Sequence, residues 1–139
     1  MLKTPLAYDP NALGVGIVHI GIGAFHRAHQ AAYTDSVLAE NGGDWRILGV
    51  SLRSTEIADA LNAQDGRYTL VIRSDQRGEP PVFREIGSVA GVLAGQRGIA
   101  PILEAMARPQ TRIVSLTITE KAYGVDLATG KLNLADRQI

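Results

Sequence analysis

The residues with the clearest chemical potential form a glycine-rich turn near the amino terminus, Gly21-Ile22-Gly23-Ala24-Phe25-His26-Arg27. In such a turn the first glycine permits a tight bend, and the second lets a phosphate group approach the main chain. A helix that starts there presents free N–H groups to the same anion. Two of the three glycines of the dinucleotide fingerprint G-x-G-x-x-G are present, and His26 takes the third position. We therefore predict a nucleotide-binding turn, with a purely structural turn as the alternative.

Several cationic or titratable side chains lie in or beside this turn. Arg27 in a first helical turn is unfavourable with the helix dipole unless an anion lies there, which favours a place for Arg27 or His26 beside the phosphates. His26 and His29 have the i, i+3 spacing that can share a metal ion. The next carboxylate is Asp35, so we expect no metal site. His19 lies inside the preceding apolar run, where we expect a hydrogen-bonded core histidine.

The adenosine end of a dinucleotide should meet the segment about 20 residues further on, where an acidic residue usually holds the ribose. That segment reads Ser51-Leu52-Arg53-Ser54, and the first carboxylate after it is Glu56. Arg53 is therefore a candidate for contact with a 2′-phosphate or for stacking on adenine. A solvated loop cation is the alternative interpretation of Arg53.

A third group of candidates follows the last predicted strand. Thr119 and Glu120 end the run Thr117-Ile118-Thr119-Glu120, at the edge that faces the nicotinamide half of a bound cofactor in a dinucleotide fold. Lys121 and Tyr123 have the chemistry of general acids, but we interpret them as surface loop residues. We find no Ser-His-Asp arrangement, paired-carboxylate site or Walker loop.

The elements that must position these residues alternate between strand and helix. We predict strands over residues 15–22, 45–52, 68–73 and 112–119, and helices over 27–41, 54–63 and 99–106. Two short edge strands, over 82–86 and 88–93, add a small β excursion. This alternation predicts an α/β fold with a doubly wound, mostly parallel, Rossmann-like sheet. Ligands of such sheets bind at the carboxyl ends of the strands.

Composition excludes several other classes of protein. The chain has 139 residues, enough for one domain, and 14 basic and 14 acidic residues give zero formal net charge. Nucleic-acid binding is not expected without excess cations and with only 5% aromatic residues. No cysteine is present, and we identify neither a signal peptide nor a membrane-length apolar run, so we expect a cytoplasmic protein. Glycine is in excess, 15 of 139 residues or about 11%.

Residues 17–30, Ile-Val-His-Ile-Gly-Ile-Gly-Ala-Phe-His-Arg-Ala-His-Gln, closely resemble the amino-terminal signature of the polyol-specific long-chain dehydrogenases, the mannitol dehydrogenase family. The similarity continues in collinear order through segments 49–53, 59–61, 64–70, 115–121 and 129–130. The Val-Ser-Leu-Arg and Thr-Glu-Lys-x-Tyr strings look more like the branch that contains fructuronate reductase and the general mannitol dehydrogenases.

This resemblance implies an NAD-dependent interconversion of a polyol or aldonate with its keto sugar by hydride transfer, as in the mannitol/fructose and mannonate/fructuronate pairs. It implies that Gly21, Gly23, Phe25, His26 and Arg27 form the cofactor turn. It also implies that Thr119 and Glu120 lie on the nicotinamide side. NAD is the expected cofactor, and the segment around Arg53 leaves NADP open.

The resemblance supplies no catalytic residue. In the family the catalytic base is a lysine of a motif Lys-x-x-x-x-Asn-x-x-His in a mostly helical carboxyl-terminal domain, and this motif does not occur in residues 1–139. We therefore expect residues 1–139 to be an amino-terminal dinucleotide-binding domain that is inactive alone. The polyol or hexuronate substrate would bind in the full-length protein. We also expect exposed apolar surface where the helical domain would pack, with self-association as a result. A stand-alone nucleotide-binding or regulatory module without catalysis is the alternative.

Overall fold

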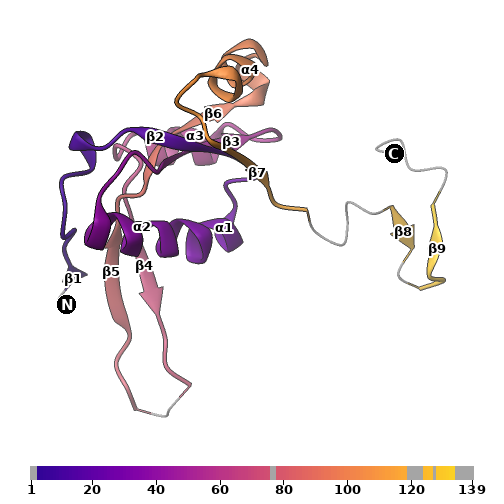
Figure 1. Ribbon diagram of the computed structural model, residues 1–139. Helices are drawn as coiled ribbons and strands as arrows, with labels where there is room; N and C mark the ends of the chain where they lie inside the picture. Colours follow the sequence, from indigo (N-terminus) through magenta and orange to yellow (C-terminus); the bar gives the residue numbers. More distant parts are fainter. Residues whose placement is uncertain (1–2, 76–77, 119–123, 127, 134–139) are drawn as a thin grey trace.

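The computed structural model describes residues 3–75, 78–118, 124–126 and 128–133. Its centre is a four-stranded parallel sheet of order β6-β3-β2-β7 (Figure 1). These strands are β2 (Val15–Ile20), β3 (Arg46–Ser51), β6 (Val89–Ala94) and β7 (Ile113–Leu116). The chain runs from β2 outward to β3 and β6 and then returns to the other side of β2 with β7. The predicted Rossmann-like α/β fold is thereby confirmed, with a topological switch point between β2 and β7.

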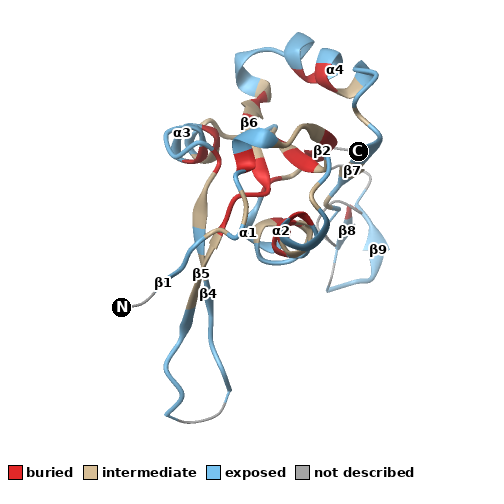
Figure 2. Cartoon of the chain, turned by 60° about the vertical axis from the view of Figure 1, so that its left-hand side comes forward, coloured by how far each residue is buried: buried red, intermediate tan, exposed pale blue. Residues whose placement is uncertain are grey.

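Helices cover both faces of this sheet (Figures 1 and 2). The helices are α1 (Ala24–Ala28), α2 (Gln30–Asn41), α3 (Glu56–Asn62) and α4 (Ala100–Ala107), with short 3₁₀ turns η1 (Pro10–Ala12) and η2 (Gly95–Arg97). Alternate residues of each strand point to opposite faces. Ile17 packs in one core with Ala31 of α2 and Leu61 of α3, whereas Val18 packs in a second core with Ile102 of α4.

A second, three-stranded sheet has the order β1-β5-β4. It consists of β1 (Lys3–Thr4), β4 (Tyr68–Ile72) and β5 (Val82–Ile86). The prediction that residues 68–73 form the third strand of the main sheet is wrong, because β4 pairs antiparallel with β5. That third strand is β6, which the sequence predicted as a short edge strand. A separate two-stranded ribbon joins β8 (Val125–Asp126) to β9 (Lys131–Leu132).

One buried carboxylate fastens the second sheet to α2. Asp35 accepts hydrogen bonds from the Tyr8 hydroxyl at 2.7 Å and from the main-chain N–H of Gly87 at 2.8 Å, and it pairs with the Arg84 guanidinium at 2.8 Å. Its side chain is only 4% exposed. These three contacts place the β4–β5 hairpin against the helix that follows the glycine-rich turn.

The first helical segment differs from the predicted single helix over residues 27–41. α1 begins three residues earlier, at Ala24, and the chain breaks at His29, where φ is −118° and ψ is −86°. A ring nitrogen of His29 pairs with the carbonyl of Phe25 at 2.8 Å and so satisfies the end of α1. α2 then starts at Gln30, so the residues of α1 and α2 do not follow one continuous helical period.

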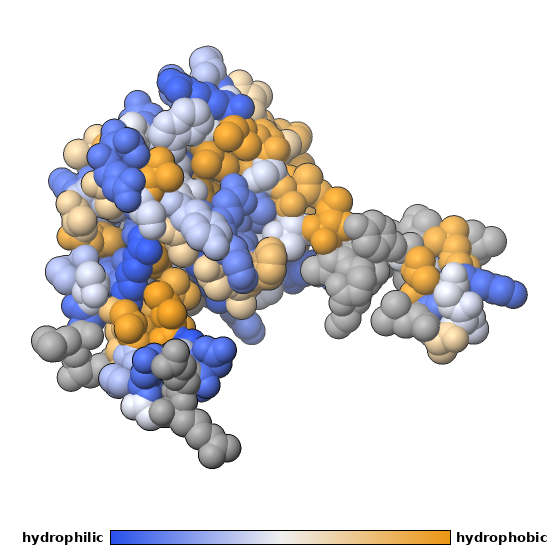
Figure 3. Space-filling view, turned by 60° about the horizontal axis from the view of Figure 1, so that its bottom comes forward, coloured by the Kyte–Doolittle hydropathy of each residue, from blue (hydrophilic) through white to orange (hydrophobic). Residues whose placement is uncertain are grey.

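β7 is one of the two edge strands of the main sheet, and its side chains are more exposed than those of β2, with which it pairs. Ile113, Val114 and Leu116 are 44%, 43% and 56% exposed. Apolar surface continues up to the grey segment that follows this strand (Figure 3). Among the described residues, no helix has the length and apolar character needed to cross a membrane.

Candidate dinucleotide site

Gly21 follows β2 at the switch point and bends the chain sharply. Its φ of +103° lies in the region that favours glycine. Its N–H donates to the carbonyl of Val50 on β3 at 2.9 Å. A Cβ added at Gly21 would lie 3.3 Å from Cβ of Thr117, just beyond β7. Glycine therefore lets the turn sit between the ends of its two neighbouring strands.

Gly23 immediately precedes α1, and the space on the side where a side chain would lie is empty. Its backbone is extended, with φ −71° and ψ −177°. A Cβ added there would meet nothing nearer than the carbonyl oxygen of Gly21, at 3.9 Å. Ala24 and Phe25, the first helical residues, are also exposed. The turn thus has free space beside the N–H groups that begin a helix, which fits a diphosphate.

Arg27 folds back over the turn. Its guanidinium donates to the carbonyl of Ile22 at 3.1 Å, and the side chain is half-buried. The Tyr68 hydroxyl donates to the carbonyl of Arg27, which ties α1 to the β4–β5 hairpin. Burial raises the pKa of Tyr68 above its ordinary value, so its hydroxyl remains a donor well into the alkaline range. Because its guanidinium is bonded to the carbonyl of Ile22, Arg27 holds its positive charge beside Gly21 and Gly23.

His26 takes a different position from the one expected. Its ring is 2% exposed and stacks on His19 of β2, with ring centroids 3.6 Å apart and planes 18° from parallel. The imidazole faces the sheet, which corrects the expectation that this side chain lies beside the phosphates. Ala24 and Phe25, in the same helical turn, are exposed, so among these three residues only His26 turns its side chain inward.

His19 is the hydrogen-bonded core histidine that the sequence predicted. Its ring is 2% exposed, and its Nδ1 and Nε2 pair with the hydroxyls of Ser115 at 2.9 Å and Thr117 at 3.0 Å. His29, by contrast, is exposed and stacks on Phe25 at 4.3 Å. In the parts of the chain that the structure describes, no group of three His, Cys, Asp or Glu residues could hold a metal ion.

The candidate adenosine edge lies after β3. Arg53 is exposed there, and its carbonyl accepts a hydrogen bond from Nε2 of Gln96 at 2.6 Å, which joins the loop after β3 to the turn after β6. The Ser54 hydroxyl accepts the N–H of Glu56 at 3.1 Å and so helps to start α3. Thr119 and Glu120, the candidates for the nicotinamide side, lie outside the described residues.

The polar residues beneath the turn were not predicted from the sequence. Ser115 and Thr117 bind His19, and Nε2 of Gln30 donates to the Ser115 hydroxyl at 3.5 Å. Their spacing could have revealed them. Ser115 and Thr117 are polar residues two positions apart in an otherwise apolar predicted strand, so their side chains lie on the same face of the sheet. That face is the one on which His19 lies, because His19 and Ser115 are register partners.

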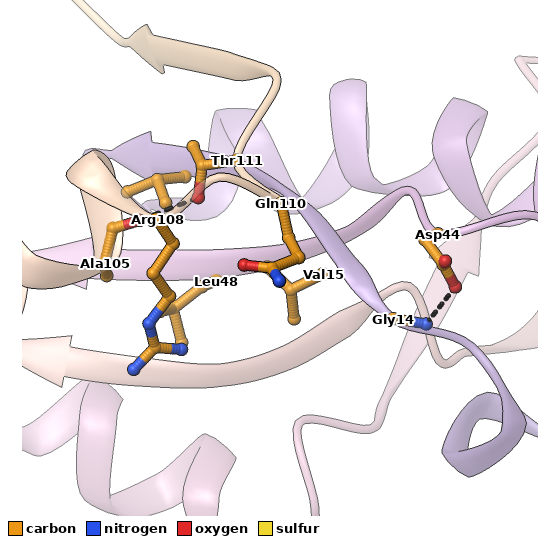
Figure 4. Close-up of a pocket in the computed structure, with 9 residues that line it drawn as sticks. Gly14, Val15, Asp44, Leu48, Ala105, Arg108, Gln110 and Thr111 are labelled. Atoms are coloured by element: carbon orange, nitrogen blue, oxygen red, sulfur yellow. Dashed lines mark hydrogen bonds between the residues drawn. The ribbon is translucent and has the colours of Figure 1, made fainter.

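The opposite end of the sheet carries a cavity of about 270 Å³. Arg108 and Gln110 lie beside the apolar side chains of Leu48 and Val15 (Figure 4). Asp44 also lines this cavity and accepts the N–H of Gly14 at 2.7 Å. These residues lie toward the amino ends of β2 and β3. The cavity is therefore distinct from the edge that holds the glycine-rich turn.

Comparison with known proteins gives consistent matches. The sequence model for the "Mannitol dehydrogenase Rossmann domain" matches residues 15–135. A mannitol 2-dehydrogenase of Cereibacter sphaeroides is 48% identical over 123 residues, which are 86% of this chain and 25% of the relative. A D-mannonate oxidoreductase of Escherichia coli (strain K12) is 42% identical over 132 residues, 92% of this chain and 26% of the relative.

Solved structures agree with these sequence matches. The Pseudomonas fluorescens mannitol 2-dehydrogenase ternary complex with NAD and D-mannitol superimposes with a TM-score of 0.80 at 40% identity, over 94% of this chain and 27% of that one. The chain thus spans about a quarter of the length of the relatives that it matches. From the matched residues and the shared fold, the chain belongs to the mannitol dehydrogenase family, whose Rossmann domain it forms over residues 15–135.

Proposed function

We propose that this chain is the NAD-binding domain of an oxidoreductase that interconverts a polyol or an aldonate with its keto sugar. The observation that carries the proposal is the glycine-rich turn at the β2–β7 switch point, where parallel sheets of this order bind dinucleotides. The names of the relatives support the substrate class, since they include mannitol 2-dehydrogenases and a D-mannonate oxidoreductase.

Each candidate residue has a defined part in this proposal. The open side of Gly23 receives the diphosphate, the N–H groups of Ala24 and Phe25 donate to it, and Arg27 supplies positive charge. Arg53 contacts the adenosine end. Family resemblance assigns Thr119 and Glu120 to the nicotinamide side. When bound, NAD supplies the carrier that accepts or donates the hydride.

We further propose that residues 1–139 bind the cofactor without turning over a sugar. The family's lysine motif, Lys-x-x-x-x-Asn-x-x-His, does not occur in them, and this motif supplies the base that takes the hydroxyl proton in the family. Steady NADH consumption by the purified chain with fructose or fructuronate would contradict this. We propose that a polyol or hexuronate is turned over only where this domain is combined with that lysine motif.

Calorimetric titration of the chain with NADH and with NADPH tests cofactor binding. Trp45 fluorescence is a poor reporter, because Trp45 precedes β3 at the end of the sheet away from the turn. We expect NADH to bind and the Arg53→Ala variant to weaken NADPH more than NADH. Absence of heat for both nucleotides in a folded sample would reject the proposal.

We also propose that the exposed surface of β7 associates with a second copy of the chain. Ile113, Val114 and Leu116 lie on the outer strand of the sheet, and such edges pair readily with another chain. Sedimentation velocity at increasing concentration should show dimers or larger species, and Leu116→Lys should reduce them. A concentration-independent monomer would contradict self-association.

A further inference from the structure

The glycine-rich turn rests on a pair of imidazole rings instead of on a direct contact between helix and strand. His26 comes from α1 and His19 from β2, and their rings stack at 3.6 Å. Both residues are 2% exposed. In the dinucleotide fingerprint the third glycine lets the first helix lie close to the strand. Here that position carries His26, so two aromatic rings occupy the space between α1 and β2.

The sheet beneath the turn is shaped to receive this arrangement. Across the strands, Gly49 on β3 and Ser115 on β7 are the register partners of His19. Ile22 sits over Gly49, whose missing side chain leaves room for it. His26 sits over His19. The turn is thus supported at two adjacent points, one aliphatic and one aromatic.

The aromatic support also reaches the carboxyl end of β7. The two ring nitrogens of His19 pair with the hydroxyls of Ser115 and Thr117. Cβ of Thr117 is 3.3 Å from the position of a Cβ on Gly21. A movement of the His19 ring would therefore be transmitted both to the end of β7 and to the first glycine of the turn.

The surroundings of His26 favour the neutral ring. Among the described residues neither of its nitrogens makes a well-formed hydrogen bond. The Gln30 side chain favours the charged ring, but it offsets only part of the effect of burial. Its titratable and charged neighbours are His19 on β2 and Arg27 on α1, and both oppose a positive charge. Burial, the largest effect, and these neighbours lower the pKa of His26 to about 4, and burial also lowers the pKa of His19.

We propose that His26 is a positioning residue whose neutral ring, stacked on His19, fixes the glycine-rich turn for the dinucleotide, and that protonation of this pair releases the cofactor. This inference rests on the proposed NAD binding. The stacked pair acts through the main chain of Gly21 and Gly23 and does not itself touch the nucleotide. A ring that cannot be protonated should keep the support and remove its sensitivity to acid.

The test is calorimetric titration of the chain with NAD⁺, which tolerates acid better than NADH. The titrations run from neutral pH down to about pH 3.5, because the His26 ring, with its pKa lowered to about 4, is still mostly neutral at pH 5. Circular dichroism checks the fold at each pH. At neutral pH we expect His26→Ala to weaken binding about tenfold or more, and His26→Phe to remain within about threefold of the parent. The parent should lose affinity as the pH falls, whereas His26→Phe should not. Ile102→Ala, a core truncation on the opposite face, should lower stability and leave the affinity and its pH profile unchanged.

Parental affinity in His26→Ala, or an unchanged acid-dependent loss in His26→Phe, would overturn the inference. If His26→Ala does not fold, the pH profile of His26→Phe decides alone. If the parent binds no NAD⁺ at any pH, the proposed function fails, and NMR of the parent then decides the inference. In that case the amide signals of Gly21 and Thr117 should shift with the same midpoint as the His26 ring. Amide signals that ignore the titration of the ring would reject the support role.

Discussion

The side chain of Ile22 packs directly over Gly49: a Cβ added at Gly49 would lie 2.8 Å from Cγ1 of Ile22 and 3.1 Å from its Cβ. Ile22 is the middle residue of the glycine-rich turn and is 1% exposed. The missing side chain in the middle of β3 therefore determines how closely the turn approaches the sheet.

Gly49→Ala should consequently destabilise the fold and displace the turn. We expect a loss of about 1 to 3 kcal/mol in the free energy of unfolding, measured by urea denaturation, because Ile22 must move as a whole. Gly91→Ala on the neighbouring strand β6 is the matched control, since its Cβ would come no nearer than 3.4 Å to Oδ1 of Asn62. Equal effects of the two substitutions would show that the contact with Ile22 is unimportant.

The two glycines of the turn should respond differently to substitution. Gly23→Val should leave the melting temperature nearly unchanged, because its Cβ has open space, yet weaken NADH binding at least about tenfold by filling that space. Gly21→Ala should cost about 1 to 2 kcal/mol of stability, because its φ of +103° strains any side chain. Full NADH affinity in a folded Gly23→Val variant would argue against a diphosphate at this place.

The buried carboxylate on α2 should be among the most sensitive positions for stability. Asp35→Ala removes the acceptor of the Tyr8 hydroxyl and of the Gly87 N–H, and it takes from Arg84 its charged partner. We expect a loss of about 3 to 5 kcal/mol in chemical denaturation. Asp59→Ala is the control, since its pair with Arg97 has side chains 56% and 55% exposed, and it should change stability by less than about 1 kcal/mol. Similar losses at both positions would refute the anchoring role of Asp35.

Stability should fall in alkaline solution, and Tyr68 is one source of this fall beside Tyr8, whose pKa is also raised by burial. The pKa of Tyr68 is raised in the folded state, chiefly by burial, so the unfolded chain releases the phenolic proton first. The contribution of Tyr68 is therefore complete below the ordinary tyrosine pKa of about 10 and is lost as the pH rises through the folded-state value. Tyr68→Phe should cost about 1 kcal/mol at neutral pH, through loss of the bond to Arg27, and should flatten the alkaline decline in urea titrations. A decline as steep as that of the parent would exclude Tyr68 as its source.

The sequence was sufficient for the alternation of strands and helices and for the position of the turn. It failed where local pattern does not determine the partner of a strand. Residues 68–72, Tyr-Thr-Leu-Val-Ile, have the stronger β propensity. Yet residues 89–94, Val-Ala-Gly-Val-Leu-Ala, form the strand of the parallel sheet. A strand of an antiparallel hairpin needs burial on one face only. In β4, half-buried residues accordingly alternate with exposed ones over its first four positions.

The side chain of His26 shows a second limit of the sequence. Its position after the two glycines was identified, but the direction of the ring follows from the start of α1 at Ala24, which places His26 on the buried side of that short helix. The chain then breaks at His29, before α2. A single helical period over residues 27–41 cannot represent such a break. To predict that the His26 ring stacks on His19, one must know which residue of β2 lies opposite α1. This is a tertiary contact, and the local sequence pattern does not contain it.

The pairing of β2 with β7 also has a consequence for the time course of synthesis. His19 and Ser115 are register partners separated by 96 residues, so the strand that carries the turn remains open on one edge until β7 has emerged from the ribosome. At ordinary translation rates this interval is roughly 5 to 20 s. During this interval the edge of β2 that will pair with β7 has no partner, and the crevice at the switch point is incomplete. This edge is therefore a suitable target for holding chaperones, and it is the last part of the sheet to close.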